Sequence, residues 1–204
     1  LGWSERCATR AAQKLPTNYE ARLDESFLRQ ACIICDYGIP AELRVNTDQT
    51  QTHYQMGGKR TWNKSGEKQV MTMGMDEKRA FTLVPSISAS GEVLPMQAIF
   101  QGKTDNSCPS KTARRYDEAT DNQFVFEPSL TGTYWSTQAT MQRLVDLIIA
   151  PYFERKKADL LLPPSQCSMW LIDCWSVHRS AEFLGWMRTT HPNIIVTFVP
   201  GNCT

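Results

Sequence analysis

Two aspartates each end a short apolar segment typical of a buried strand, and together they could support metal-dependent chemistry. Asp48 ends the run Val-Asn-Thr-Asp, and Asp173 ends the run Trp-Leu-Ile-Asp. Acids that end neighbouring strands of an α/β sheet converge on one point, where two unpaired carboxylates repel each other and favour a divalent cation. Paired ions of this kind serve phosphoryl transfer, because one activates the attacking oxygen and the other stabilises the leaving oxygen. The alternative is that each aspartate is a solvated strand end or a helix N-cap.

Basic residues gather in three places that could contact nucleic acid. Basic side chains around an aromatic ring suit phosphate neutralisation combined with base stacking. The first cluster has this character, since it surrounds Trp62, and the other two are purely basic. For all three, the alternative is an ordinary solvated charged face. The clusters are Lys59, Arg60, Lys64 and Lys68; Lys111, Arg114 and Arg115; and Arg155, Lys156 and Lys157.

The composition excludes several classes of protein. The chain has 204 residues, of which 22 are Lys or Arg and 21 are Asp or Glu, so its net charge of +1 excludes a strongly basic coat. No apolar run approaches the length of a membrane span, and we expect no membrane partner. Seven scattered cysteines do not predict a disulfide framework. The pair Cys32-x-x-Cys35 has no second pair at zinc-finger spacing, so we expect no structural metal there.

The elements that must position these residues alternate between strands and helices. Residues 1–40 are predicted to be mostly helical, with a capping box at Thr17-x-x-Glu20 and a stop at Gly38 and Pro40. The turn 89–91 predicts a hairpin, and 101–133 is expected to be irregular. Antiparallel strands followed by a βαβ pattern predict a mixed sheet with helices on its faces. The predicted strands are 43–48, 70–75, 80–88, 92–100, 169–173 and 193–199, and the predicted helices are 137–149, ending before Pro151, and 180–188.

Four blocks of sequence, in the correct order, are shared with a known family. They are residues 45–50, 82–103, 171–178 and 198–204. Together they resemble the DDE superfamily endonuclease domain, the transposase core of pogo/Tigger and mariner-like type. The resemblance implies an α/β fold, RNase H-like, with a mixed sheet and helices on both faces. It divides the chain into a helical N-terminal extension, 1–40, and a DDE-type catalytic core, 41–204, that is truncated at its C-terminus.

The same resemblance implies roles for particular residues. Asp48 and Asp173 would be the catalytic acids that hold Mg²⁺ or Mn²⁺ for nicking and strand transfer on DNA. His178 would lie near a helix start, where it contacts DNA phosphate, braces the site or has a purely structural role. Gln49 and Thr50 would orient the first carboxylate or satisfy backbone groups. The family further implies DNA as the partner, no small-molecule substrate and a nuclear location.

The third acid of the family does not appear in the printed sequence. The resemblance places it on a helix beyond residues 198–204, whereas Glu182, the only acid after Asp173, falls on the preceding helix. We therefore expect little strand-transfer activity from the isolated chain. The third acid could lie in a longer protein or come from a partner; alternatively, the chain is a domesticated, inactive domain that binds nucleic acid or protein. Without the last helix, we expect either a homodimer or a sheet face covered by residues 1–40.

Overall fold

The computed structural model describes residues 3–7, 16–54, 60–66, 80–201 and 203. The strands are β1 (Trp3–Cys7), β2 (Arg44–Thr47), β3 (Thr50–His53), β4 (Arg60–Lys64), β5 (Ala80–Val84), β6 (Ser86–Ser88), β7 (Gln97–Phe100), β8 (Val125–Pro128), β9 (Ser168–Ile172) and β10 (Ile194–Phe198). The helical elements are α1 (Tyr19–Tyr37), η1 (Ala41–Leu43), η2 (Asp105–Ser107), α2 (Tyr116–Asp121), α3 (Gln138–Leu144), the π-helical turn η3 (Val145–Ile149), α4 (Ala150–Asp159) and α5 (Ala181–Thr190). In these ranges no helix is long and apolar enough to cross a membrane.

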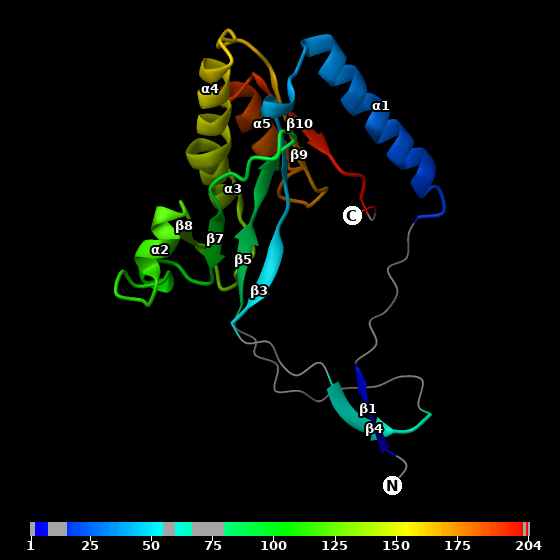
Figure 1. Cartoon of the computed structure of the whole chain (residues 1–204), viewed down its shortest axis with the longest axis vertical. Helices are drawn as coiled ribbons and strands as arrows, with labels where there is room; N and C mark the ends of the chain where they lie inside the picture. The colour runs from blue at the N-terminus through cyan, green and yellow to red at the C-terminus, as the bar shows by residue number, and fades with distance from the viewer. Residues whose placement is uncertain (1–2, 8–15, 55–59, 67–79, 202, 204) are drawn as a thin grey trace.

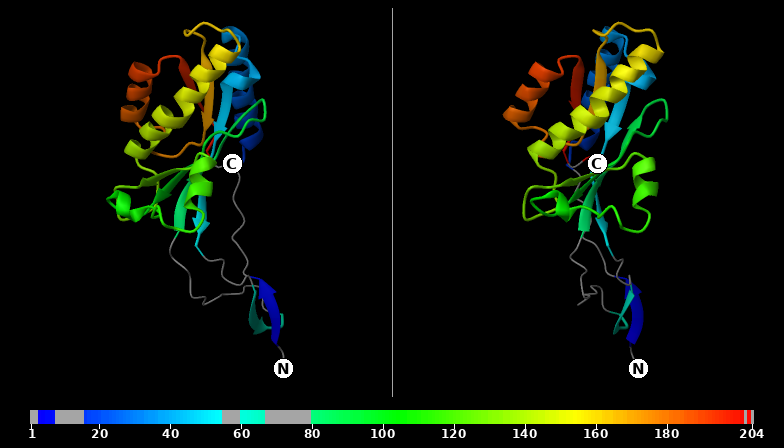
Figure 2. Two further views of the ribbon diagram at one scale, coloured as in Figure 1. Left: turned by 60° about the vertical axis from the view of Figure 1, so that its left-hand side comes forward. Right: turned by 90° about the vertical axis from the view of Figure 1, so that its left-hand side faces the viewer.

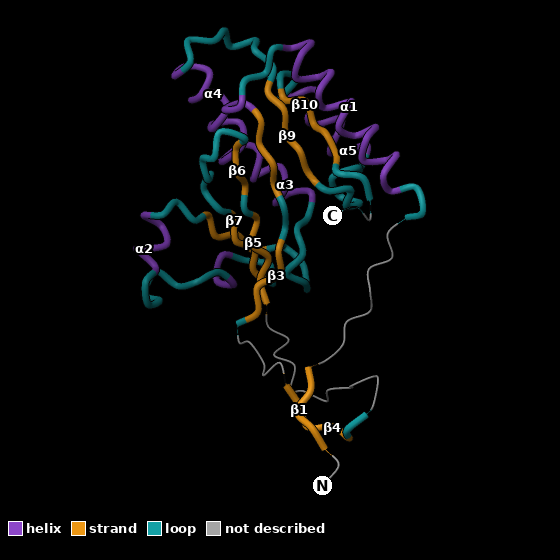
Figure 3. Tube along the Cα trace, turned by 45° about the vertical axis from the view of Figure 1, so that its right-hand side comes forward, coloured by secondary structure: helices purple, strands orange, loops and turns teal. Residues whose placement is uncertain are grey.

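Two four-stranded sheets are joined where the chain passes directly from a strand of one sheet to a strand of the other. One sheet has the order β10-β9-β2-β6 and the other has the order β3-β5-β7-β8. Only Asp48 and Gln49 separate β2 from β3, and only Pro85 separates β5 from β6. The backbone N–H of Asp48 donates to the carbonyl of Pro85 across this double break, at 3.2 Å. The two sheets therefore follow one another along the strand direction, because β2 continues into β3 and β5 continues into β6 (Figure 3).

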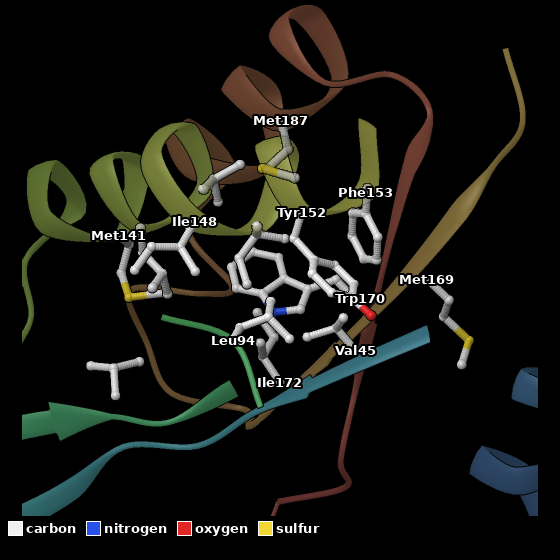
Figure 4. Close-up of a cluster of buried hydrophobic side chains, with 14 of the residues drawn as sticks. Val45, Leu94, Met141, Ile148, Tyr152, Phe153, Met169, Trp170, Ile172 and Met187 are labelled. Carbon is white, nitrogen blue, oxygen red and sulfur yellow. The ribbon is translucent and has the colours of Figure 1, made fainter. Parts of the chain in front are cut away.

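The main core lies on the face of this sheet that α3, η3, α4 and α5 cover. Side chains alternate between the two faces of a strand, and the buried residues Val45 and Thr47 on β2 share a face with Trp170 and Ile172 on β9. Figure 4 shows these apolar strand residues packed beneath the helices, with Phe153 and others from the helical layer beside the Trp170 indole. This packing fixes the positions at which β2 and β9 end.

The helix α1 lies along the opposite side of the strands, next to β9 and β10 (Figures 1 and 2). Its Ile33 and Ile34 pack against the core, whereas Phe27 and Leu28 are 62% and 67% exposed. The Ser26 hydroxyl also donates to the carbonyl of Phe198 on β10, at 3.5 Å. A helix from the N-terminal segment thus covers part of this face, which is one of the two arrangements that the sequence predicts.

The N-terminal segment corrects two details of the sequence prediction. Helix α1 ends at Gly38 as predicted, because Gly38 adopts the left-handed conformation with φ 57°. The predicted capping box is wrong, since Asn18 is the N-cap and makes no side-chain cap hydrogen bond. The segment is also not helical throughout, because Trp3–Cys7 forms β1, which pairs antiparallel with β4.

Two further differences concern the rest of the chain. The helix predicted to end before Pro151 instead continues to Asp159, because Pro151 lies at the first turn of α4, directly after the π-helical turn. The segment 101–133 is not wholly irregular, since it contains α2 and also β8, which pairs parallel with β7. The hairpin at 89–91 is present, with antiparallel Ile87 and Val93 on either side. The strand predicted at 70–75 lies outside the described residues.

Candidate active site

Asp48 and Asp173 directly follow two neighbouring parallel strands, β2 and β9. The register pairs Val45 with Trp170 and Asn46 with Leu171. If this register is extended by two residues beyond the last printed pair, Asp48 corresponds to Asp173. Neighbouring strands lie about 4.8 Å apart, and positions in register on parallel strands share a face. The sheet therefore brings together the two acids that the sequence singled out.

Asp48 occupies the break between β2 and β3. Its side chain is exposed, and its Oδ1 accepts a hydrogen bond from the backbone N–H of Gln49 at 2.8 Å. Because its backbone N–H pairs with Pro85, the residue is held by main-chain contacts on both sides. The carboxylate thus has a fixed base and a solvent-accessible end.

Asp173 is held by a different set of contacts. Nδ1 of His178 lies 2.6 Å from its Oδ1 and 3.2 Å from its backbone carbonyl oxygen, and the N–H of Trp175 donates to Oδ1 at 3.5 Å. The hydrogen bond from His178 lowers the pKa of Asp173 below its usual value, and this effect outweighs the opposing effect of partial burial. Asp173 is consequently an ionised carboxylate at neutral pH.

A buried polar chain lies directly before the two acids and crosslinks three strands. Nε1 of Trp170 donates to the hydroxyl of Thr47 at 2.8 Å, and that hydroxyl also bonds to the hydroxyl of Ser86 at 2.7 Å. All three side chains are buried. A hydrogen-bonded chain in a dry interior resists displacement of β2 relative to β9 and β6. The spacing of Asp48 and Asp173 is therefore set by a rigid base.

The donor set fits a hard divalent cation. Each carboxylate uses Oδ1 in the hydrogen bonds above, and no described residue hydrogen-bonds to Oδ2 of Asp48 or Asp173. Carboxylate oxygens are the ligands that Mg²⁺ and Mn²⁺ prefer. In the described ranges, no group of three His, Cys, Asp or Glu residues is arranged to hold a metal ion. Glu182 is exposed in the first turn of α5 and does not complete such a group.

His178 lies buried between Asp173 and Gln49. Its side chain is 3% exposed, Nδ1 bonds to Asp173, and Nε2 lies 3.0 Å from Nε2 of Gln49. With both ring nitrogens engaged inside the protein, the imidazole has no donor left for a phosphate. The buried imidazole fits the predicted bracing role better than the predicted contact with DNA phosphate, and both roles stay predictions.

Gln49 lies between the two halves of the site, and its partner Ser136 was missed by the sequence analysis. The hydroxyl of the buried Ser136 donates to Oε1 of Gln49 at 2.6 Å. Ser136 is 87 residues after Gln49 in the sequence and comes just before α3. No sequence signal identifies it, because a serine before a helix is usually read as part of a cap.

The predicted basic clusters differ in their surroundings. Lys59 and Lys68 lie outside the described residues, Arg60 and Trp62 are on β4, and Lys64 is exposed at the end of that strand. In the second cluster Lys111, Arg114 and Arg115 are all exposed, and Arg115 pairs with Glu118.

The third basic cluster lies on α4 and is engaged in ion pairs. Arg155 and Lys156 both pair with Glu92, at 2.7 and 2.6 Å. Lys157 is buried and pairs with Glu154 at 2.9 Å. Arg155 and Lys156 thus tie α4 to Glu92, and Lys157 also donates to the carbonyl of Pro164 at 3.1 Å, so the three side chains are less available to phosphate than those of the second cluster.

Comparison with known proteins adds evidence on the fold. No protein-family model and no curated protein matches the chain. One similar solved structure is a pre-cleavage Mos1 transpososome, with TM-score 0.53 and 10% identity; the match covers 97% of this chain and 48% of that chain. Another is a Mos1 transposase paired-end complex with left transposon end, with TM-score 0.51 and 10% identity; the match covers 97% of this chain and 47% of that chain. A Mos1 mariner paired end complex with Mn has TM-score 0.52 and 12% identity, and the match covers 94% of this chain and 46% of that chain.

These likenesses show that the chain has a mariner-like transposase fold. The predicted fold class, a mixed α/β sheet with helices on both faces, is thereby confirmed. The chain spans about half the length of the Mos1 chains that it matches. At this level of identity the comparison speaks for the fold and not for the chemistry.

Proposed function

We propose that residues 41–204 form the core of a DDE-type transposase that acts on DNA phosphodiester bonds with a divalent metal. The observation that carries this proposal is that Asp48 and Asp173 directly follow the neighbouring parallel strands β2 and β9, at the same end of the sheet. Each carboxylate has one oxygen fixed by hydrogen bonds within the chain and one oxygen available to a ligand. One Mos1 mariner paired end complex is described with Mn, which supports the use of a divalent metal by a protein of similar fold.

Each residue of the site would have its own role. Asp48 and Asp173 would each give one oxygen to Mg²⁺ or Mn²⁺, which when bound supplies activation of the attacking oxygen and stabilisation of the leaving oxygen. His178 donates to Asp173 and so keeps that carboxylate ionised and fixed in orientation. The chain Trp170–Thr47–Ser86 holds the spacing of the strands that carry the two acids.

DNA is the proposed partner. The Mos1 neighbours are described as a transpososome and as paired-end complexes, one of them with a left transposon end. The exposed Lys64, Lys111 and Arg114 give this chain cationic groups for phosphate contacts. We further propose that the protein works as a homodimer in the nucleus, because pairing two DNA ends brings two catalytic cores together.

A second candidate is a domesticated domain that binds DNA or protein without cleaving DNA. It is favoured by one observation: the described residues bring together two acids and not three. Both candidates predict DNA binding or partner binding, whereas only the first predicts that the two aspartates hold a metal. Metal binding is therefore the property that separates them.

The test is calorimetric titration of the whole chain with Mn²⁺, compared with its Asp48→Asn and Asp173→Asn variants. Asparagine keeps the size of the side chain and removes the charge, so each variant is expected to weaken Mn²⁺ binding at least about 10-fold. Asp121→Asn, at an exposed position on α2, is the matched control and is expected to bind as the wild type does.

A second readout locates the ion. Fe²⁺ bound in place of Mn²⁺ cleaves hydrogen peroxide to hydroxyl radicals, with ascorbate returning Fe³⁺ to Fe²⁺, and mass spectrometry identifies the peptide bonds that the radicals cut. We expect cleavage near residues 48 and 173, and competition by Mg²⁺. Equal Mn²⁺ affinity in all four proteins, or cleavage far from these residues, would sink the metal-dependent proposal and leave the binding domain as the better account.

A further inference from the structure

Four side chains from three separate parts of the chain form one line of polar contacts that ends at Asp173. The hydroxyl of Ser136 lies 2.6 Å from Oε1 of Gln49, and Nε2 of Gln49 lies 3.0 Å from Nε2 of His178. Nδ1 of His178 then lies 2.6 Å from Oδ1 of Asp173. This line joins the loop before α3, the β2–β3 break and the segment after β9.

The directions of the hydrogen bonds follow from the chemistry of the groups. An ionised carboxylate only accepts, so His178 carries its proton on Nδ1 and donates to Asp173. Its Nε2 then accepts from the amide N–H of Gln49, which leaves Oε1 of Gln49 to accept from Ser136. Each group in the line has the partner that it requires, so the imidazole is held in one tautomer.

Burial fixes the imidazole further. His178 is 2% exposed, and the indole of Trp175 meets it edge-on, with ring centroids 5.6 Å apart and an interplanar angle of 88°. Ser136 is also buried, at 3% exposed. Packing and hydrogen bonds together leave the imidazole little freedom to rotate, so the direction of its Nδ1–H is set by the protein.

We propose that His178, held by Gln49 and Ser136, is a positioning residue that orients the carboxylate of Asp173 for the metal. This inference rests on the proposed function. Hydrogen bonds to ligating groups fix the orientation of those groups, and their removal typically weakens metal affinity about 10- to 100-fold. Because Gln49 directly follows Asp48, the same line also ties the segment of the first acid to the second acid.

The experiment measures Mn²⁺ affinity by calorimetry in a graded set of variants. His178→Leu removes both hydrogen bonds and is expected to weaken Mn²⁺ binding about 10- to 100-fold. His178→Asn restores a donor near the position of Nδ1 and is expected to recover part of that loss. Gln49→Leu leaves the His178–Asp173 contact in place, so it is expected to give a smaller loss and serves as the test if His178→Leu does not fold.

His191 supplies a matched control, because it forms the same kind of pair elsewhere. Its Nε2 lies 2.9 Å from Oδ1 of Asp146. His191→Leu therefore removes a histidine–aspartate contact without touching the site, and its Mn²⁺ affinity is expected to stay within about 2-fold of the wild type. A drop in the control equal to that of His178→Leu would mean that the loss is a general effect on stability, and would overturn the inference.

A measurement without metal tests the tautomer. Imidazole ¹⁵N chemical shifts of the folded chain are expected to show the proton of His178 on Nδ1, and Gln49→Leu is expected to shift the Nε2 signal. A proton on Nε2 in the wild type would overturn the inference.

The two proposals fail in different ways. If Asp173→Asn loses Mn²⁺ while folded His178→Leu and Gln49→Leu bind it as the wild type does, the positioning role is wrong and the metal site stands. If Asp48→Asn and Asp173→Asn both bind Mn²⁺ as the wild type does, the proposed function fails and the positioning role fails with it.

Discussion

The substitution Thr47→Val should lower the free energy of unfolding far more than the same substitution of a threonine at the surface does. The hydroxyl of Thr47 is the shared partner of Trp170 Nε1 and of the Ser86 hydroxyl, at 2.8 and 2.7 Å. Valine has nearly the same shape, so Thr47→Val leaves two buried polar groups without that partner. Each orphaned group costs about 1–3 kcal/mol, which gives about 2–6 kcal/mol in total.

The assay is urea unfolding followed by tryptophan fluorescence and circular dichroism. A domain of this size loses about 2–4 °C of Tm per kcal/mol, so the Tm of thermal unfolding should fall by about 4–24 °C. Thr50→Val, at an exposed position on β3, is the control and should change stability by less than about 0.5 kcal/mol.

A double-mutant cycle isolates the mechanism. Ser86→Ala alone should destabilise the protein, because the hydroxyl of Thr47 then loses one partner. In the Thr47→Val background the same change removes an orphaned hydroxyl, so it should be close to neutral, with a coupling of about 0.5–3 kcal/mol. Equal costs of Ser86→Ala in both backgrounds, or a Thr47→Val protein as stable as the control, would refute the reasoning.

Two further predictions concern parts of the chain away from the site. Burial and neighbouring carboxylates raise the pKa of the Cys108 thiol, so less of it is in the reactive thiolate form at pH 7.5. Iodoacetamide should therefore alkylate Cys108 more slowly than the exposed Cys32, and mass spectrometry of the folded protein measures the two rates. Gly102 has φ 147°, and an added Cβ would clash with the side chain of Ser107, so Gly102→Ala should destabilise the fold by at least about 1 kcal/mol in urea unfolding. Gly132→Ala, with open space at its Cβ, should be close to neutral.

The strands that end on acids could be predicted because their signal is local. An apolar run followed by an aspartate indicates a buried strand end, and β2 and β9 end directly before Asp48 and Asp173. That the two strands are parallel neighbours is a property of the fold, which the family resemblance implied and the strand pattern alone did not fix. The metal at this point stays a prediction.

Two errors in the fold have identifiable physical causes. The rule that proline ends a helix assumes that its missing N–H and its ring break an α-helical turn, but Pro151 lies in the first turn of α4, after the π-helical turn Val145–Ile149, and the helical backbone continues through it. The strand β8 was missed because its buried position is Glu127, whose charge hides the apolar pattern. The partners of that carboxylate, Arg143 and Gln97, come from distant segments that a local pattern does not show.

The two acids of the site are supported in unlike ways, and this difference follows from how each strand ends. β2 runs on into β3 after a two-residue break, so Asp48 is held by backbone contacts on both sides and its carboxylate stays exposed. β9 leads into a loop, where backbone pairing no longer fixes the side chain of Asp173. A buried histidine supplies that constraint instead, and it must itself be anchored, which Gln49 and Ser136 do. A loop acid therefore needs side-chain support where a strand-break acid does not, so substitutions along the line from Ser136 to His178 should affect the two carboxylates unequally.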